Sequence, residues 1–228
     1  MIKKRLESDK SGSFILDLAF NAPEGITILF GASGAGKTTT LRAIAGMITP
    51  DEGRISIGSD VYFDSAKSTN LSIQARRVGY VFQDYALFPH LTAEQNVAYG
   101  IKGEKHAARM ERARALLALF QIEHVRRRYP QNMSGGEQQR TALARALASD
   151  PRVVLLDEPL SAVDQATRTL LLDEVVRAQQ QFDIPFVYVT HNTAEAIRLG
   201  TRVVVLNEGR IKRTGSPAEI FDPAESES

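Results

Sequence analysis

Short apolar runs rich in β-branched residues alternate along the chain with stretches in which apolar residues recur every three or four positions. The first pattern is typical of buried β-strands and the second of amphipathic helices. A chain that alternates the two favours an α/β fold, in which a mostly parallel sheet is flanked by helices. Five apolar runs are predicted to form the core strands: Ile26–Phe30, Gly79–Phe82, Val153–Leu156, Phe186–Val189 and Val203–Leu206.

The stretch between Asp84 and Asp150 contains no comparable strand-like run. Its apolar residues, among them Leu116, Leu117 and Leu143, follow helical spacing. We therefore expect a helical subdomain of about residues 84–150, inserted into a sheet core of about residues 1–83 and 151–228. The total of 228 residues suits one such domain rather than two independent ones.

Composition narrows the classes of partner and chemistry. Lys and Arg total 28 against 27 for Asp and Glu, and the resulting net charge of +1 gives no electrostatic reason to expect nucleic acid. The absence of cysteine excludes disulfides, thiolate catalysis and cysteine-ligated zinc. The longest apolar run, Ala115–Phe120, is far shorter than the ~20 residues that a membrane-spanning helix needs. The basic first residues lead into Glu7, Ser8 and Asp9 where a signal peptide would be apolar, so we expect the protein to stay where it is made.

A glycine-rich loop follows the first predicted core strand. Residues 31–38 read Gly-Ala-Ser-Gly-Ala-Gly-Lys-Thr, a full match to the phosphate-loop pattern between a strand and a helix. Small residues let consecutive backbone N–H groups turn inward around a phosphate, and the helix that follows points the positive end of its dipole there. Lys37 would reach the β- and γ-phosphates, and the Thr38 hydroxyl would ligate Mg²⁺. The residues predicted to bind nucleotide here are Gly31, Ser33, Gly34, Ala35, Gly36, Lys37, Thr38 and Thr39.

Two adjacent carboxylates end the most continuous apolar strand. The run Val153–Leu156 is followed directly by Asp157 and Glu158. Such a continuous run indicates a central strand, buried on both faces. We expect Asp157 to hold Mg²⁺, directly or through water, and Glu158 to polarise a water for attack on the γ-phosphate.

A phosphate loop with an acidic pair is compatible with kinases, GTPases and ATP-driven motors. A GTPase would need Asn-Lys-x-Asp to read guanine, and no asparagine here is followed by lysine. The run Met133–Glu137 reads Met-Ser-Gly-Gly-Glu and lies about twenty residues before Asp157. It resembles the signature of the ABC ATPases, usually written Leu-Ser-Gly-Gly-Gln. Ser134 and Glu137 also form a helix-capping box, but a cap alone does not explain two adjacent glycines, which weaken a first helical turn.

The resemblance covers essentially the whole chain and implies further site residues. It implies a phosphate-loop ATPase core with an antiparallel β region near the N-terminus. Gln83 corresponds to the glutamine that contacts Mg²⁺ and the attacking water, and His191 to the histidine on the γ-phosphate. Ser161–Asp164 resembles the loop that crosses the dimer interface. Nucleotide would also be bound by the signature and interface residues Ser134, Gly135, Gly136, Glu137 and Asp164.

Some positions depart from the family pattern or leave a choice open. The family stacks an aromatic side chain on adenine; Phe14 is our assignment and Phe20 the alternative, since either could equally be core. Met133 replaces the usual Leu, a volume-conserving exchange, and Glu137 replaces Gln. Asn192 follows His191 where Asp is common.

The resemblance also implies partners. ABC ATPases bind two ATP between two subunits, so we expect a homodimer in which the phosphate loop of one chain faces the signature of the other. The segment Gln83–His90 corresponds to the groove that receives a permease helix, and we expect Leu87 and Phe88 to be partly exposed there. A solute-binding protein would act indirectly, and the subunit would lie peripherally on the cytoplasmic face of the inner membrane.

The resemblance also bears on the transported solute and on the class of ABC protein. The amino-acid sequences of the loop, of residues 77–90 and of the signature are most similar to those of bacterial molybdate importers. Sulfate, ferric-iron and polyamine importers share much of these sequences. A soluble ABC protein acting on ribosomes or DNA is the alternative of a different class. One uninterrupted cassette, near-neutral charge and no heptad run argue against that alternative. The few residues after Phe221 could not bury the core of a C-terminal regulatory domain, so we do not expect this sequence to sense the cargo.

Overall fold

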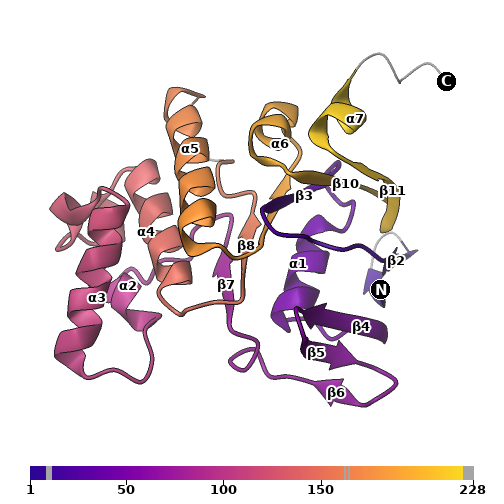
Figure 1. Ribbon diagram of the computed structural model, residues 1–228, viewed down its shortest axis with the longest axis horizontal. Helices are drawn as coiled ribbons and strands as arrows, with labels where there is room; N and C mark the ends of the chain where they lie inside the picture. Colours follow the sequence, from indigo (N-terminus) through magenta and orange to yellow (C-terminus); the bar gives the residue numbers. More distant parts are fainter. Residues whose placement is uncertain (9–11, 162, 164, 223–228) are drawn as a thin grey trace. The chain divides into compact units, whose positions relative to one another are not determined.

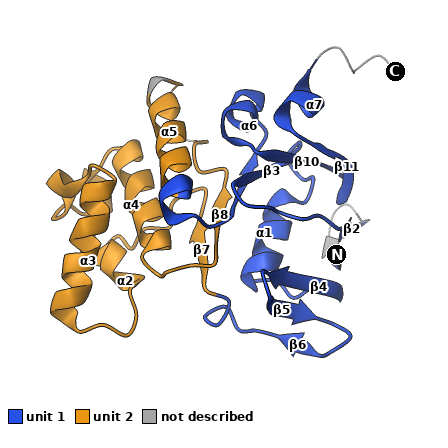
Figure 2. Ribbon diagram, viewed as in Figure 1, with its two compact units in different colours: residues 1–76, 179–228 blue, residues 77–178 orange. Residues whose placement is uncertain are grey.

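The computed structural model (Figure 1) describes residues 1–8, 12–161, 163 and 165–222. The chain forms two compact units, residues 1–76 with 179–228 and residues 77–178 (Figure 2). Each unit combines strands and helices, which confirms the α/β fold class. No helix among these described residues is long and apolar enough to cross a membrane.

The first unit begins with an antiparallel β region. β1 (Ile2–Ser8) pairs along its whole length with β2 (Gly12–Leu18), and its start also pairs with β4 (Glu52–Ile57). β5 (Asp60–Asp64) and β6 (Thr69–Asn70) continue this antiparallel ladder from β4. The antiparallel region implied by the family resemblance is therefore present.

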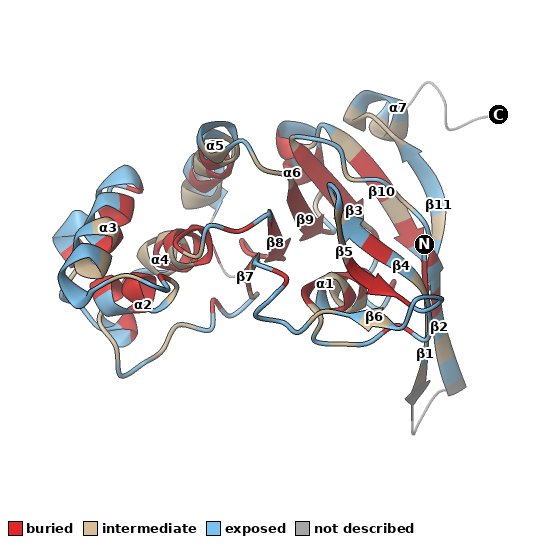
Figure 3. Cartoon of the chain, turned by 60° about the horizontal axis from the view of Figure 1, so that its bottom comes forward, coloured by how far each residue is buried: buried red, intermediate tan, exposed pale blue. Residues whose placement is uncertain are grey.

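The rest of the first unit carries the parallel strands. β3 (Ile26–Phe30) lies between β9 (Phe186–Thr190) and β10 (Arg202–Asn207), parallel to both. β10 turns back into β11 (Arg210–Gly215), and the two strands pair antiparallel as a hairpin. Figure 3 shows β3, β9 and β10 largely buried and β11 largely exposed. The helices of this unit are α1 (Lys37–Ala45), which contacts β9, α6 (Thr193–Leu199), which packs on β3 and β9, and α7 (Pro217–Phe221).

The second unit contains the helical part of the chain. β7 (Val78–Val81) and β8 (Val153–Asp157) form a parallel pair. Between them come α2 (Ala93–Tyr99), α3 (His106–Leu119) and α4 (Gly135–Leu147), with short 3₁₀ turns η1 (Glu123–Val125) and η2 (Pro130–Asn132). α5 (Gln165–Phe182) follows β8 and continues into the first unit.

Close contact between α4 and β7 makes these helices and strands one unit. A Cβ atom on Gly79 would come within 2.8 Å of the Ala146 carbonyl oxygen, so only glycine allows the helix to approach the strand so closely. Residues 84–150 contain helices and turns but no strand, as predicted. The compact unit extends further, to residues 77–178, because β7 pairs with β8 and packs under α4.

Candidate functional site

The glycine-rich loop leaves β3 and leads directly into α1. Gly34 has φ 81° and Gly36 has φ 100°, backbone conformations that favour glycine. A Cβ atom on Gly34 would meet nothing within 4 Å, so packing does not demand a glycine there. The outer face of the loop is thus left open for a close approach to its backbone, which fits the phosphate cradle predicted from the sequence.

Lys37, the first residue of α1, is buried and held against the loop. Its ammonium group donates hydrogen bonds to the carbonyl oxygens of Gly31, at 2.8 Å, and Ala32, at 2.9 Å. The positive charge therefore lies over the loop rather than in solvent. Of the other predicted loop residues, Ser33 is exposed, Ala35 is buried, and Thr38 and Thr39 are half-buried.

His191 leaves the strand next to the loop. Phe30 and Thr190 are register partners in the parallel pair β3–β9, so the loop and His191 follow adjacent strand ends. His191 is exposed. Asn192 caps α6, because its side-chain oxygen accepts hydrogen bonds from the backbone N–H of Ala194 and Glu195. An amide oxygen serves as a cap as well as a carboxylate does, which explains why Asn can replace Asp here.

The aromatic residue assigned to adenine lies beside the loop. Phe14 is half-buried on β2, and a Cβ atom on Gly36 would come within 3.1 Å of its ring. Phe20 is also half-buried, but it lies beyond the end of β2. The structure thus brings Phe14 to the loop; a stacking role for it stays a prediction.

The acidic pair lies at the end of the buried strand β8. Asp157 is 6% exposed, and its carboxylate accepts a hydrogen bond of 3.0 Å from the Tyr80 hydroxyl. Glu158 has φ 45°, a left-handed backbone conformation that costs a non-glycine residue about 1 to 3 kcal/mol. Backbone strain of this kind is typical of functional sites. Because of it, the Glu158 side chain does not continue the alternating side-chain directions of β8.

Gln83 lies at the same edge of the parallel pair. Val81 is the register partner of Leu156, so the chain leaves β7 and β8 at the same level. Gln83 is exposed. Among the described residues, no group of three or more His, Cys, Asp or Glu side chains gathers into a metal site. The donors predicted for Mg²⁺ are instead one hydroxyl, one carboxylate and one amide, a donor set that fits an ion which keeps water or phosphate oxygens as its other ligands.

The signature residues form the start of α4. The Ser134 backbone N–H donates to the Glu137 carboxylate at 2.7 Å, and the Glu137 N–H donates to the Ser134 hydroxyl oxygen at 3.3 Å. This confirms the predicted capping box. The other oxygen of Glu137 lies 3.1 Å from Nε2 of His124. Burial acts to raise the pKa of Glu137, but the bonds from Ser134 and His124 outweigh it and lower that pKa.

The two signature glycines differ in their surroundings. A Cβ atom on Gly136 would lie 3.3 Å from the Thr167 side chain of α5, a tight contact. A Cβ atom on Gly135 would meet nothing within 4 Å, and its helical backbone does not need glycine either. Packing therefore explains why residue 136 is a glycine but not why residue 135 is one. The backbone at Gly135 is open to the approach of a bound group.

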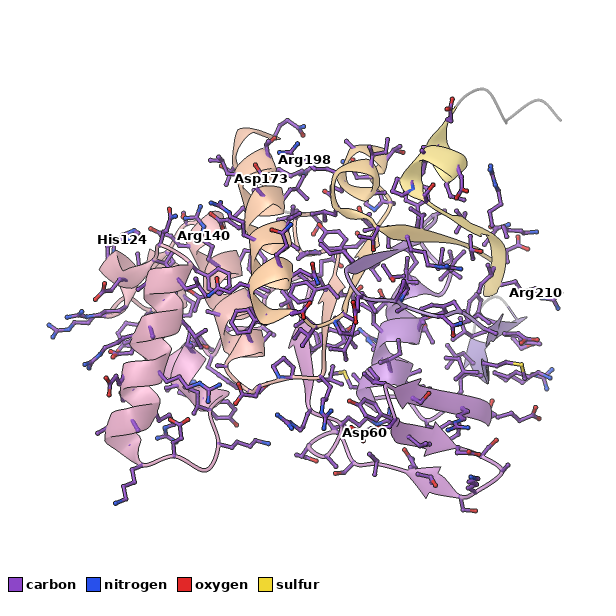
Figure 4. The ribbon with its side chains drawn as sticks, viewed as in Figure 1. Asp60, His124, Arg140, Asp173, Arg198 and Arg210 are labelled. Carbon is purple, nitrogen blue, oxygen red and sulfur yellow. The ribbon has the colours of Figure 1, made fainter. Side chains whose placement is uncertain are left out.

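Three residues beside the predicted ones were not found from the sequence. Tyr80 reaches Asp157, His124 (labelled in Figure 4) reaches Glu137, and Arg145 reaches the turn after Gln83. Strand pairing puts Tyr80 opposite Leu155, on the face that Asp157 shares, and no local signal in the sequence marks this pairing. Ala162 and Asp164 of the predicted interface loop lie outside the described residues.

Comparison with known proteins agrees with the family resemblance. The family model described as "ABC transporter" matches residues 16–161. The molybdenum import ATP-binding protein ModC of Brucella melitensis biotype 1 is 43% identical over 220 residues, and that of Vibrio vulnificus is 41% identical over 211 residues. The alignments cover 96% and 92% of this chain but 61% and 56% of those relatives, so the chain spans about three fifths of their length.

Solved structures of similar fold include two cassettes. The structure of cbiO1 from Clostridium perfringens, described as part of the ABC transporter complex cbiONQ, has a TM-score of 0.83 and 26% identity; the match covers 98% of this chain and 91% of that one. The dimeric ATP-binding cassette MJ0796, described as a post-hydrolysis state bound to ADP and Pi, has a TM-score of 0.77 and 28% identity, with 95% and 96% covered. The phosphate loop, acidic pair and signature thus stand on a shared fold, and the chain belongs to the ABC transporter family.

Proposed function

We infer that this chain is the ATP-binding and ATP-hydrolysing subunit of a transporter that imports a small solute. The observation that carries the proposal is the occurrence, in one chain, of an open phosphate loop and a signature whose Gly135 is not required by packing. Both are surfaces of backbone N–H groups at helix N-termini, the arrangement that binds polyphosphate anions. The MJ0796 cassette, of the same fold, is described as bound to ADP and Pi.

Each predicted residue has a role that its chemistry supports. Lys37 would donate hydrogen bonds to phosphate oxygens, and His191 would donate to the γ-phosphate. Thr38, Asp157 and Gln83 would hold Mg²⁺ through a hydroxyl, a carboxylate and an amide oxygen. When bound, Mg²⁺ would neutralise charge on the β- and γ-phosphates. Glu158 would accept the proton of the attacking water.

Binding by the purified chain tests the first part of the proposal. Wild-type protein should bind a fluorescent ATP analogue with Mg²⁺ and release phosphate from ATP. Lys37→Ala should lose most of that affinity, because the cation on the loop is gone. Lys67→Ala, at an exposed lysine far along the sequence from the loop, is the matched control and should bind as wild type does. Equal affinity of Lys37→Ala and Lys67→Ala would contradict the nucleotide site.

The chain should work as a homodimer. It carries one phosphate loop and one signature, so two copies would complete two sites. Light scattering in the presence of ATP and Mg²⁺ should detect a dimer of Glu158→Gln, which binds without turning over. A strictly monomeric state of that variant under saturating ATP would contradict the dimer.

The docking surface for a permease is proposed at the segment after β7. Leu87 and Phe88 are half-buried, and the Phe88 ring packs 4.6 Å from that of Tyr99, which is 64% exposed. This partly exposed apolar cluster would receive a short cytoplasmic helix, which would place the subunit peripherally on the inner face of the membrane. Co-purification with the membrane fraction should fall when Phe88 and Tyr99 are both replaced by Ser.

Molybdate is the cargo that similarity favours. Several relatives about 42% identical are described as molybdenum import proteins. The gene should restore molybdoenzyme activity at low molybdate to a bacterial strain that lacks its own molybdate-import ATPase and retains the permease. Rescue of a sulfate, ferric-iron or polyamine importer instead would assign the subunit to one of those systems.

A further inference from the structure

The turn that follows Gln83 adopts a strained backbone. Tyr85 has φ 62° and Ala86 has φ 43°, so two consecutive non-glycine residues are left-handed. Such a conformation persists only where the surroundings hold it in place.

Two side chains from different helices, Asn96 and Arg145, hold this turn and the residues after it. Asn96 of α2 holds the later part: it accepts a hydrogen bond from the Phe88 N–H at 2.9 Å and donates to the Leu91 carbonyl at 3.0 Å. Arg145 of α4 holds the strained part. Its guanidinium donates to the carbonyl oxygen of Ala86 at 2.7 Å and to that of Tyr85 at 2.8 Å. The same group lies over the Phe88 ring, 5.4 Å from its centre.

Burial of the Arg145 guanidinium in this position carries a desolvation cost. Among the described residues its partners are carbonyl oxygens and a ring rather than a carboxylate, and burial lowers its pKa. A half-buried cation that faces carbonyl groups and a ring must be compensated by those contacts. The planar fork of the guanidinium matches two successive carbonyls, which a lysine ammonium does not.

The helix that carries Arg145 begins at the signature. Ser134 caps α4, and Arg145 lies near the other end of the same helix. One rigid element therefore joins the start of α4 to the turn that lies between Gln83 and the apolar cluster of Leu87, Phe88 and Tyr99.

We propose that Arg145 is a positioning residue that holds the turn at Tyr85 and Ala86 and thereby fixes Gln83. This inference rests on the proposed ATPase function and deepens it. Removal of the guanidinium should free the turn while leaving the phosphate loop intact.

The test compares three variants of the 228-residue chain. Hydrogen exchange, followed by mass spectrometry of the peptide containing residues 83–88, reports on the turn directly. Arg145→Met should raise its exchange rate about tenfold or more, and Arg145→Lys should fall between. Arg140→Met is the matched control: Arg140 lies on the same helix but ties it to Glu174 of α5 at 2.8 Å, so residues 83–88 should exchange as in wild type.

Steady-state kinetics separates positioning from general loosening. Arg145→Met should lower kcat for ATP about tenfold with KM changed less than twofold, because Gln83 is misplaced while the phosphate loop is untouched. Arg145→Lys should recover part of kcat, and it also serves if Arg145→Met does not fold. Wild-type exchange at residues 83–88 in Arg145→Met or in Arg145→Lys would overturn the proposal, and so would a matched loss of exchange protection in Arg140→Met. If wild type itself hydrolyses no ATP, the proposed function fails, and the exchange result still decides whether Arg145 holds the turn.

Discussion

Replacement of Arg76 by Met should destabilise the first unit. Arg76 is 1% exposed. Its guanidinium donates to the carbonyl oxygens of Ala43 and Ile44, both at 2.8 Å, at the C-terminal end of α1. It also donates to the Leu71 carbonyl at 3.0 Å and to the Asn70 side chain at 2.8 Å. The cation thus lies at the negative end of the helix that starts at the phosphate loop.

The magnitude follows from the groups that would lose a partner. Asn70 is exposed and can turn to water, and the Ala43 carbonyl keeps the backbone N–H of Gly46 as a donor. The carbonyl acceptors of Ile44 and Leu71 therefore remain unpaired. Each costs about 1 to 3 kcal/mol when buried, and the gain from no longer burying a charge offsets part of this cost. We expect a net loss of about 2 to 4 kcal/mol. For a chain of this length that corresponds to a fall in melting temperature on the order of 10 °C.

Thermal unfolding followed by circular dichroism measures this loss. Arg77→Met is the control, because the neighbouring Arg77 is exposed and its guanidinium donates to a single carbonyl, that of Asp150 at 2.7 Å. It should cost about 1 kcal/mol or less. Arg76→Lys should fall between, since one ammonium cannot reach all the acceptors. Equal melting temperatures for Arg76→Met and Arg77→Met would refute the reasoning.

Other predictions concern the nucleotide chemistry. Glu158→Gln should keep ATP binding and lose most turnover; a phosphate-release assay giving the wild-type rate would remove Glu158 from its role. Ser134→Arg should abolish hydrolysis while each chain still binds ATP, and mixing it with Lys37→Ala should restore at most one intact site per dimer; loss of ATP binding by Ser134→Arg alone would argue against a shared site. Tyr80→Phe removes one hydrogen bond to Asp157 and should raise the Mg²⁺ or Mn²⁺ concentration needed for nucleotide binding about tenfold or more. An unchanged Mn²⁺ titration, read by electron paramagnetic resonance, would show that Asp157 needs no such support.

The buried core was predictable because its pattern is continuous. β3, β8 and β9 consist of apolar runs that are buried almost throughout, and each agrees with its predicted span to within a residue. The capping box at Ser134 was predictable for a similar reason, since its two partners lie three residues apart. Local signals of this kind need no knowledge of the tertiary structure.

The strands β4, β5 and β6 were not predicted individually. β4 buries only Ile55, and β6 is two residues long, so neither presents the alternating or continuous apolar pattern of a strand. Their identity depends on pairing with β1 and with one another.

The supporting residues of the site were missed for a different reason. Tyr80 and Asp157 are 77 positions apart in sequence, and Arg145 and Tyr85 are 60 apart. A tyrosine on a strand and an arginine on a helix carry no local mark of such a partner. Only the packing of α4 on β7, and the pairing of β7 with β8, brings them together.

The capping box at the start of α4 also has an electrostatic consequence. A carboxylate stands at Glu137 where the family usually has a neutral amide, and a free negative charge there would repel a polyphosphate that approaches Gly135. One oxygen of that carboxylate is turned back onto the Ser134 N–H, and the other faces the imidazole of His124. Both oxygens of the carboxylate are therefore engaged, by the cap and by a neighbouring ring. We expect an anion to approach the exposed N–H groups of the first turn even though an acidic residue occupies this position.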